Sequence, residues 1–463
     1  MEKAATVDSK SDLSNEMNDT IVALATPIGR SGIGVVRLSG AESLNITSKL
    51  VSDTSFSPLP RQAILRSVWD VTGVEIDEVL ITFFKGPKSF TGEDVIEISC
   101  HGSPIVLRQI IDSCLTYGAR LASPGEFSLR ALGNGRINLA QAEAIRDLIE
   151  AQSVTAARQS LRQMKGELSA TIAPFSNELL NTIVVLESSL EFVEDDLPQF
   201  RNNAISESLT RLATDLDSLA ATFSSGRLFR DGIAVVLVGR PNVGKSSLFN
   251  KIIGSERAIV TEIPGTTRDQ IRETLIIKGV PVSLTDTAGI RATEDVVEVI
   301  GVERSKRIMS DADIILVVID SSSQLTDGDT EILNQAAQFE HLVIFNKSDL
   351  PVCQDLKITN PSVKVSAKDG TGIEELKASI IYPFSKVTEN ASGFLISDAR
   401  HHDLLNRASA EIRKSIETIS NGESEEITLV GLHNSLRLLG QITGETTTED
   451  MLTRIFSTFC IGK

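Results

Sequence analysis

The segment Gly239–Ser246, with the sequence GRPNVGKS, constrains the fold of this chain more than any other feature. It fits the phosphate-binding loop pattern G-x-x-x-x-G-K-[ST] and lies between an apolar run at Ile233–Val238, which predicts a strand, and a helical pattern at Ser246–Ile253. The glycines of such a loop let backbone N–H groups surround phosphate oxygens, and the helix that follows adds a positive dipole end. We expect Lys245 to contact the β- and γ-phosphates and the Ser246 hydroxyl to bind Mg²⁺. The other GTP contacts predicted in this part of the chain are Asn242, Val243, Gly244, Ser247, Thr261, Thr266 and Thr267.

Further motifs follow in the order expected of a GTP-binding domain, each after a predicted strand. Asp286–Gly289 (DTAG) follows the apolar run Val280–Leu284, so that Asp286 can hold Mg²⁺ through water and the glycine N–H can contact the γ-phosphate. Asn346–Asp349 (NKSD) follows Leu342–Phe345. The carboxylate of Asp349 can accept hydrogen bonds from N1 and the exocyclic amino group of guanine, a donor pair that adenine lacks. The predicted GTP contacts here are Asp286, Thr287, Ala288, Gly289, Asn346, Lys347, Asp349, Ser366, Ala367 and Lys368.

The segment Pro264–Asp269 (PGTTRD) is interpreted as a switch loop in which Thr267 binds Mg²⁺. Small Ras-like GTPases carry a glutamine after the D-x-x-G motif to orient the attacking water, but here that position is Ile290. Arg268 is a candidate arginine finger, whereas Arg291 is better explained as a solvated charge. Alternatively, the carbonyl oxygen of Asn242 and backbone carbonyls of the loop from Thr261 to Thr267 could hold a monovalent cation that neutralises the γ-phosphate. Asn242 could instead bond only its own backbone.

Length and composition predict a multidomain protein of the reducing cytoplasm. A chain of 463 residues exceeds what one core can hold, and 41% hydrophobic with 23% charged residues is typical of globular proteins. The four cysteines form no CxxC pair, and no apolar run reaches the length of a membrane span, so we expect no membrane partner. The N-terminus lacks the features of a signal or transit peptide. The net charge of −17 does not suggest a general nucleic-acid binder, so any RNA contact must use a local patch or a partner's surface.

The periodicity of apolar residues predicts a multidomain α/β protein with an inserted nucleotide domain. Residues 1–17 are predicted to be a disordered tail, and residues 18–134 an α+β domain with strands near Thr20–Thr26, Gly34–Leu38, Ala63–Trp69, Val74–Phe84 and Asp94–Cys100. Residues 135–226 carry long helical stripes, with breaks or kinks at Pro174 and Pro198, that stop near Ser224–Gly226. A Ras-like P-loop GTPase domain at 227–385 then interrupts an all-α domain that resumes at 386–463.

Motifs outside the nucleotide domain show a resemblance to the MnmE (TrmE) family of tRNA modification GTPases that covers nearly the whole chain. Generic GTPases do not carry them: Asp19–Ala23 (DTIVA), Ser89–Asp94 (SFTGED), Pro124–Ser128 (PGEFS), Leu139–Ala144 (LAQAEA) and Phe459–Lys463 (FCIGK). The resemblance implies a homodimer built through the N-terminal domain, which binds a formyl-tetrahydrofolate. It also implies an FAD-dependent MnmG-type partner, with which the protein installs an aminomethyl-type group on C5 of the wobble uridine, position 34, of certain tRNAs.

The resemblance also assigns roles to individual residues. Its K⁺ ligands fall on Asn242 and the backbone of Thr261, Ile263 and Thr266; its Mg²⁺ ligands on Ser246 and Thr267; its water-positioning glutamate on Glu298; and its folate contacts on Arg37, Glu97, Arg136 and Lys463. From the residues alone, Glu298 would be a solvated helix charge. Arg136 and Lys463 suit the carboxylates of a folate tail, and Glu97 suits the donor edge of a pterin.

Departures from the family pattern are small. The usual His-Gly-Gly is His101-Gly102-Ser103, and the last base motif ends in Lys368 where some members have arginine. Cys460 lies four residues from the C-terminus, but Gly462 and Lys463 do not fit a prenylation box. We therefore predict that Cys460 acts near the modification site; the alternative is a buried small apolar residue.

Two functions are compatible with the nucleotide motifs. The first is a GTPase subunit of a tRNA-modifying enzyme, and the second is a ribosome-assembly or regulatory GTPase without modification chemistry. An assembly GTPase should carry a basic RNA-binding module, which the sequence does not show. The N-terminal motifs and the CIGK end favour the first function.

Overall fold

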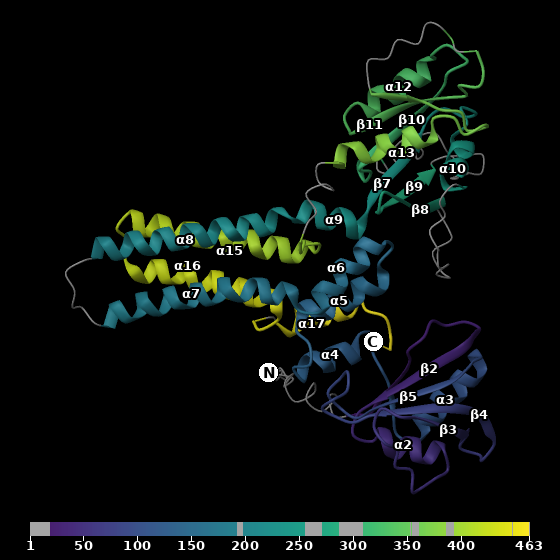
Figure 1. The fold of residues 1–463 in the computed structure, drawn as a ribbon, viewed down its shortest axis with the longest axis vertical. Coiled ribbons are helices and arrows are strands. Elements are labelled where there is room, and N and C mark those ends of the chain that lie inside the picture. The colour runs from purple at the N-terminus through teal and green to yellow at the C-terminus, as the bar shows by residue number, and fades with distance from the viewer. Residues whose placement is uncertain are drawn as a thin grey trace, which may run out of the picture. The chain divides into compact units, whose positions relative to one another are not determined.

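The computed structural model describes residues 19–191, 198–254, 271–286, 309–351, 353, 361–385, 393–446 and 448–462. By contacts the chain divides into two compact units (Figure 1). The first comprises Met1–Arg146, Gln163–Ser169 and Gly440–Lys463, and the second comprises Asp147–Arg162 and Ala170–Leu439. The predicted multidomain α/β fold class is confirmed. The boundaries of the five segments given above stay predictions.

The first unit contains a six-stranded sheet in the order β3-β4-β5-β2-β1-β6, in which only the pairing of β1 with β6 is parallel. Val36 and Leu38 of β2 point into the core, so their neighbour Arg37 lies on the opposite face. The helices α2 and α3 supply Ile46, Leu107 and Ile110 to the same core. The elements are β1 (Ile21–Leu24), β2 (Ser31–Ser39), α2 (Ser43–Leu50), β3 (Ala63–Trp69), β4 (Glu75–Phe84), β5 (Val95–Gly102), α3 (Pro104–Thr116) and β6 (Arg120–Leu121).

Helical elements complete the first unit. The side chains of Leu139, Ala142, Phe456 and Phe459 form one buried cluster, which joins the start of α5 to the end of the chain. The helices here are α4 (Glu126–Gly133), α5 (Leu139–Glu150), which continues into the second unit, and α17 (Glu449–Phe456).

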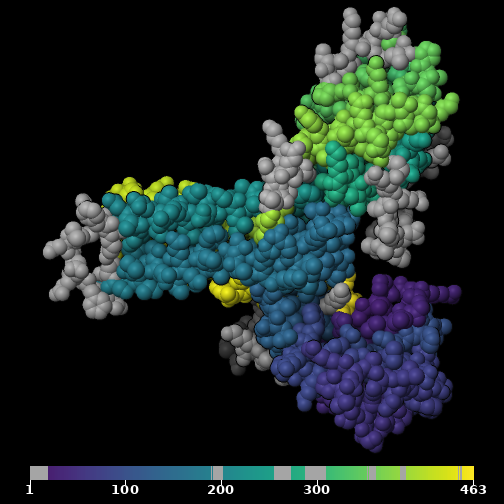
Figure 2. All heavy atoms as spheres, in the orientation of Figure 1, coloured from purple at the N-terminus to yellow at the C-terminus, as the bar shows by residue number. Residues whose placement is uncertain are grey.

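The second unit contains a bundle of four long helices, two from before the nucleotide domain and two from after it (Figures 1 and 2). Ser409 of α15 donates to the carbonyl of Ala213 in α8, at 3.3 Å, and Ser435 of α16 donates to that of Ala408 in α15, at 3.1 Å. The end of α6, the start of α7 and the end of α16 belong to the first unit. The helices are α6 (Val154–Met164), α7 (Glu167–Glu191), α8 (Pro198–Ala221), α9 (Phe223–Asp231), α15 (Ala399–Ser420) and α16 (Glu425–Thr443).

One sequence prediction about helix ends was wrong. The helical pattern does not stop at Ser224–Gly226, because α9 runs through these residues. Leu228 and Phe229 of α9 are buried in the core of the nucleotide domain, so tertiary packing outweighs the poor helix propensity of serine and glycine. Pro174 does not end α7, which continues through it, whereas Pro198 is the first residue of α8, where its missing N–H is not needed.

The nucleotide domain leaves and rejoins the bundle at one place. The backbone N–H of Ile396 donates to Thr222 Oγ1 at 3.0 Å. A Cβ atom on Gly226 would lie 2.0 Å from the carbonyl oxygen of Ile396, so only glycine allows this approach. The segment entering the domain and the segment leaving it are therefore in direct contact.

A second six-stranded sheet forms the nucleotide domain, in the order β12-β11-β10-β7-β9-β8. All neighbours are parallel except β8 and β9. Alternate residues of β7 face two cores: Ile233, Val235 and Leu237 pack with α10 and α13, and Val236 and Val238 pack on the face that α12 covers. The elements are β7 (Ile233–Val238), α10 (Lys245–Gly254), β8 (Ile271–Ile277), β9 (Val280–Asp286), β10 (Ile314–Asp320), α12 (Asp327–Ala336), β11 (His341–Asn346), β12 (Ser362–Lys364), α13 (Ile373–Ile381) and the 3₁₀ helix η2 (Tyr382–Phe384).

This topology places the nucleotide motifs at one edge of the sheet. The strands β7, β9, β10 and β11 are parallel, and the phosphate loop, Asp286, Asp320 and Asn346 stand at their carboxyl ends. Ligands of open α/β sheets bind at that edge. Within the described ranges, no helix has the length and apolarity needed to cross a membrane.

Candidate nucleotide-binding site

The phosphate loop connects β7 to α10 and depends on two glycines. Gly239 has φ +153°, and a Cβ there would lie 2.4 Å from the carbonyl oxygen of Val318 in β10. Gly244 has φ +94°, and a Cβ there would lie 2.4 Å from Nδ2 of Asn346. Any side chain at either position would displace the loop from the strand ends. Asn242 has φ +65°, a left-handed conformation that asparagine tolerates better than most residues.

Lys245 and Ser246 begin α10 beneath the loop. The ammonium of Lys245 donates to the carbonyl oxygens of Gly239 at 2.7 Å and Arg240 at 2.8 Å. Burial lowers the pKa of Lys245, while the nearby Asp286 carboxylate opposes that shift. Ser246 Oγ donates to Asp286 Oδ2 at 2.9 Å, and Asp286 is 2% exposed. A hydroxyl and a carboxylate side by side at a phosphate loop are hard oxygen donors that fit Mg²⁺.

The N-K-x-D motif is joined to two other segments by Asn346. Its Nδ2 donates to the carbonyl of Val243 in the phosphate loop at 2.9 Å, and its Oδ1 accepts from the N–H of Ala367 at 3.1 Å. Ser366 Oγ donates to Asp349 Oδ1 at 2.9 Å, and the Lys368 ammonium lies 3.9 Å from Asp349 Oδ2. The structure thus brings together the phosphate loop, Asp349 and the Ser366–Lys368 segment, as the sequence predicted.

Sequence reasoning missed two aspartates that support these motifs. Asp320 ends β10, and its Oδ2 accepts from the Lys347 ammonium at 2.6 Å. Burial alone would raise the pKa of Asp320, but hydrogen bonds from Lys347 and Ser322 outweigh it and the pKa is lowered. Asp329 pairs with Arg240 in the phosphate loop. Both carried a signal: Asp320 follows a buried strand, and Thr326–Asp329 fits the capping box pattern [ST]-x-x-[DE].

Several predicted site residues lie outside the described residues. They include every predicted K⁺ ligand except Asn242, one Mg²⁺ ligand and the predicted water-positioning glutamate: Thr261, Ile263, Thr266, Thr267, Thr287, Ala288, Gly289, Glu298 and Lys463, with Arg268, Ile290 and Arg291.

The predicted folate residues are only partly gathered. The β2–β5 register pairs Arg37 with Glu97, and the guanidinium donates to Glu97 Oε1 at 2.7 and 3.0 Å. Arg37 Nη1 also donates to the carbonyl of Gly462 at 3.0 Å, which brings the chain end to this pair. Arg136 instead donates to the carbonyl of Ser89 at 3.2 Å. Cys460 is exposed, so the alternative of a buried small apolar residue is wrong.

A buried ion network explains two of the motifs on which the resemblance depends. Arg130 is 2% exposed; its Nη2 donates to Glu126 Oε1 at 2.9 Å and its Nη1 to Glu93 at 3.2 Å. Glu126 also accepts from Arg120 at 2.8 Å. These contacts tie the SFTGED and PGEFS segments together and pair each buried charge.

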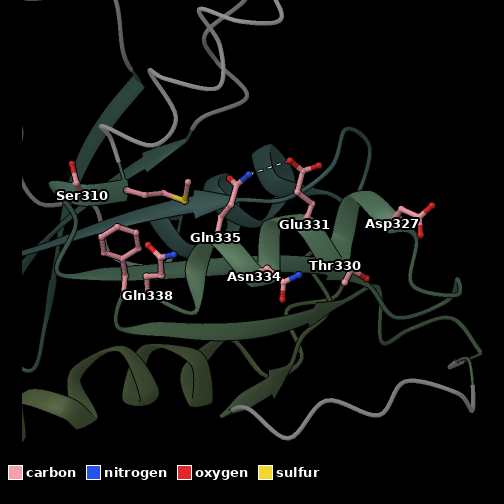
Figure 3. Close-up of a pocket in the computed structure, with 9 residues that line it drawn as sticks. Ser310, Asp327, Thr330, Glu331, Asn334, Gln335 and Gln338 are labelled. Atoms are coloured by element: carbon pink, nitrogen blue, oxygen red, sulfur yellow. Dashed lines mark hydrogen bonds between the residues drawn. The ribbon is translucent and has the colours of Figure 1, made fainter.

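A separate hollow of about 980 Å³ lies along α12 (Figure 3). Figure 3 shows Glu331 and Gln335 side by side on the helix, joined by a hydrogen bond of 3.2 Å. Among the described residues that line it, none belongs to the nucleotide motifs. The lining residues are Met309, Ser310, Asp327, Thr330, Glu331, Asn334, Gln335, Gln338 and Phe339.

Two family models of related name match this chain, one in its N-terminal part and one over the rest. Residues 139–460 match the model described as "MnmE helical domain", and residues 20–136 match "GTP-binding protein TrmE N-terminus". The protein named tRNA modification GTPase MnmE of Aquifex aeolicus is 44% identical over 96% of this chain and 100% of its own length. Those of Koribacter versatilis and Alkaliphilus oremlandii are each 40% identical over 96% of this chain and 100% of their own.

The chain belongs to the MnmE family. Its membership extends over the sheet of the first unit, the helical bundle and the inserted nucleotide domain, because the relatives match along their whole length. Among solved structures, the G domain of T. maritima FeoB is 26% identical, over 32% of this chain and 97% of that one, with a TM-score of 0.25.

Proposed function

We propose that this member of the MnmE family binds and hydrolyses GTP as one subunit of a tRNA-modifying enzyme. Its curated relatives carry the name tRNA modification GTPase. The observation that carries the proposal for GTP is the position of Asn346, which contacts the phosphate loop through Val243 and the base segment through Ala367. One side chain thereby fixes the distance between the phosphate site and the guanine-reading carboxylate of Asp349.

The same geometry supports a role for two cations. Ser246 and Asp286 supply oxygen donors for Mg²⁺, which would neutralise charge on the phosphates when bound. Asn242 stands in the phosphate loop with its backbone in a left-handed conformation. We propose that K⁺ binds there, with Thr261, Ile263 and Thr266 completing the site, and that Glu298 positions the attacking water.

The finer part of the proposal concerns the chemistry on tRNA. The protein acts on C5 of the wobble uridine with a one-carbon unit from formyl-tetrahydrofolate, as a homodimer and together with an FAD-dependent MnmG-type partner. The supporting observation is that Arg37 contacts both Glu97 and the carbonyl of Gly462 in the first unit. Gly462 is two residues after the exposed Cys460. Glu97 can accept hydrogen bonds from the donor edge of a pterin, and Arg37 holds its carboxylate in place.

The test is nucleoside analysis of tRNA from a strain that lacks this protein, with and without the gene restored. We expect loss of the C5 modification at position 34 in the deletion strain and its return on restoration. The purified full-length protein should release phosphate from GTP and not from ATP. Normal wobble uridines in the deletion strain, together with intact GTP hydrolysis, would favour the regulatory GTPase instead.

A further inference from the structure

The side chain of Arg240, the second residue of the phosphate loop, is 31% exposed and reaches the first turn of α12. Its Nε donates to Asp329 Oδ1 at 2.8 Å. Asp329 is 2% exposed, and a Cβ atom on Gly328 would lie 3.2 Å from Arg240 Cδ. The guanidinium stem therefore passes closely over the helix start, where glycine leaves room for it.

The carboxylate of Asp329 has two separate tasks, one for each oxygen. Oδ2 accepts from the N–H of Thr326 at 3.0 Å, which is one half of the capping box that starts α12, and it also accepts from the Thr326 hydroxyl at 2.9 Å. Oδ1 holds Arg240. A charge-assisted hydrogen bond to a buried carboxylate is of the strong kind, so the helix start and the loop start are firmly joined.

The consequence for the nucleotide site follows from the backbone of Arg240. Its carbonyl oxygen is one of the two that hold the Lys245 ammonium, at 2.8 Å. Gly239, on its other side, is fixed against Val318 by close approach. The loop start is thus held by its side chain on α12 and by its backbone on β10, and both anchors determine where Lys245 and the loop N–H groups point.

We propose that Asp329 is a positioning residue for the nucleotide: through Arg240 it holds the phosphate loop in its binding shape, without touching the nucleotide itself. The inference rests on the proposed GTP function. It adds a residue of α12, outside the nucleotide motifs, to those that determine nucleotide affinity.

The test measures release of a fluorescent GDP analogue and GTP hydrolysis on the full-length protein. Asp329→Asn keeps the shape and an acceptor for the cap but weakens the Arg240 contact, and Arg240→Ala removes it. Each should speed GDP release and raise the KM for GTP by about tenfold, the effect of losing one charge-assisted hydrogen bond, with a smaller change in kcat. Asp329→Glu, which retains the charge and is a natural capping-box residue, should restore much of the affinity.

Two controls separate positioning from folding. Thr326→Ala breaks the hydroxyl contact of the cap but leaves Arg240 paired, and Asp327→Asn changes an exposed acid on the same turn. Both should release GDP at the wild-type rate. The double variant Asp329→Asn with Arg240→Ala should release GDP no faster than the single variant that releases it faster, because both changes remove the same contact. Wild-type GDP release in Asp329→Asn, equal damage in Thr326→Ala, or additive effects in the double variant would each overturn the inference. Failure of the wild-type protein to bind GDP would instead overturn the proposed function.

Discussion

At the scale of single residues, we predict that the carboxylate of Asp349 selects guanine. Ser366 and Lys368 hold its two oxygens, so Asp349→Asn should weaken GTP binding by at least about tenfold, because the amide presents a donor where guanine also has one. The same variant should gain affinity for xanthosine triphosphate, whose exocyclic oxygen accepts from an amide. Competition binding with both nucleotides measures this, and Asp327→Asn is the matched control. If the two affinities do not move in opposite directions, Asp349 does not read the base.

Asn242 is the second residue-scale prediction. GTP hydrolysis should rise strongly when K⁺ replaces Na⁺ at equal ionic strength, because the smaller ion fits a cage of carbonyl oxygens less well. Asn242→Ala should remove this response and leave nucleotide binding mostly intact; Asn242→Gly, which favours the left-handed backbone, controls for the loop conformation. The measurement is the rate of phosphate release from GTP in K⁺ and in Na⁺ for the wild type and both variants. A response that survives in Asn242→Ala would show that the cation binds elsewhere.

At the scale of elements, α9 is joined to two other helices by Arg230. The guanidinium contacts Asp147 of α5 at 3.0 Å and Asp398, the N-cap of α15, at 2.9 Å. Burial alone would raise the pKa of Asp398, but the charges of His401 and Arg230 and the hydrogen bonds it accepts outweigh this and hold the pKa well below its usual range. Its ionised form therefore stabilises the fold at neutral pH, and this stability is lost as pH falls below about 4.

Arg230→Met should consequently destabilise this region by about 3 kcal/mol at pH 7, because it leaves two carboxylates without their shared cation. The variant should also lose less stability than the wild type when the pH falls from 7 to about 3, because only the wild type then loses the contribution of the ionised pairs. Thermal unfolding at both pH values measures the two effects. Arg407→Met, at an exposed pair on α15, should behave like the wild type. If the stability of the Arg230 variant and that of the wild type depend on pH in the same way, the ion pairs of Arg230 do not stabilise the fold as described.

The chain end is the other element for which the structure sharpens a prediction. Phe456 and Phe459 pack in the core of the first unit, whereas Cys460 is exposed. Truncation after Phe459 should therefore keep the fold and GTP hydrolysis, yet abolish wobble-uridine modification, and Cys460→Ser should impair modification in the same way. Nucleoside analysis and phosphate release on the same variants separate the two activities. Full modification by the truncated chain would make the tail a passive end.

At the scale of the whole molecule, sequence patterns predicted the parts with strong local signals. Ala63–Trp69 was predicted to the residue, because its β-branched and aromatic side chains leave little alternative. The contact between Asp349 and the Ser366–Lys368 segment joins residues that the sequence assigned to one GTP site. Motif residues came together because each stands at the end of a parallel strand.

The features that the sequence did not predict depend on contacts between residues that are far apart in the chain. Helix α9 contains Ser224, Ser225 and Gly226, and it forms because Leu228 and Phe229 are buried by strands that lie later in the chain. The contact between Arg240 and Asp329 joins residues 89 positions apart, and nothing in either local pattern indicates the other. Likewise, the local sequence around Arg136 gives no sign of its hydrogen bond to the carbonyl of Ser89, and its role as a folate contact stays a prediction.

The contact between Gly226 and Ile396 has a consequence for how such a protein can be assembled from modules. When the segments that enter and leave a domain touch each other, the domain can be removed and a few residues can join the two ends that remain. A chain in which Thr222 is linked directly to the Ile396 segment would lose α9 and its ion pairs, but α8 and α15 would still face each other. The nucleotide-binding domain is therefore inserted at one point of the helical bundle, where it leaves the packing of α8 against α15 intact.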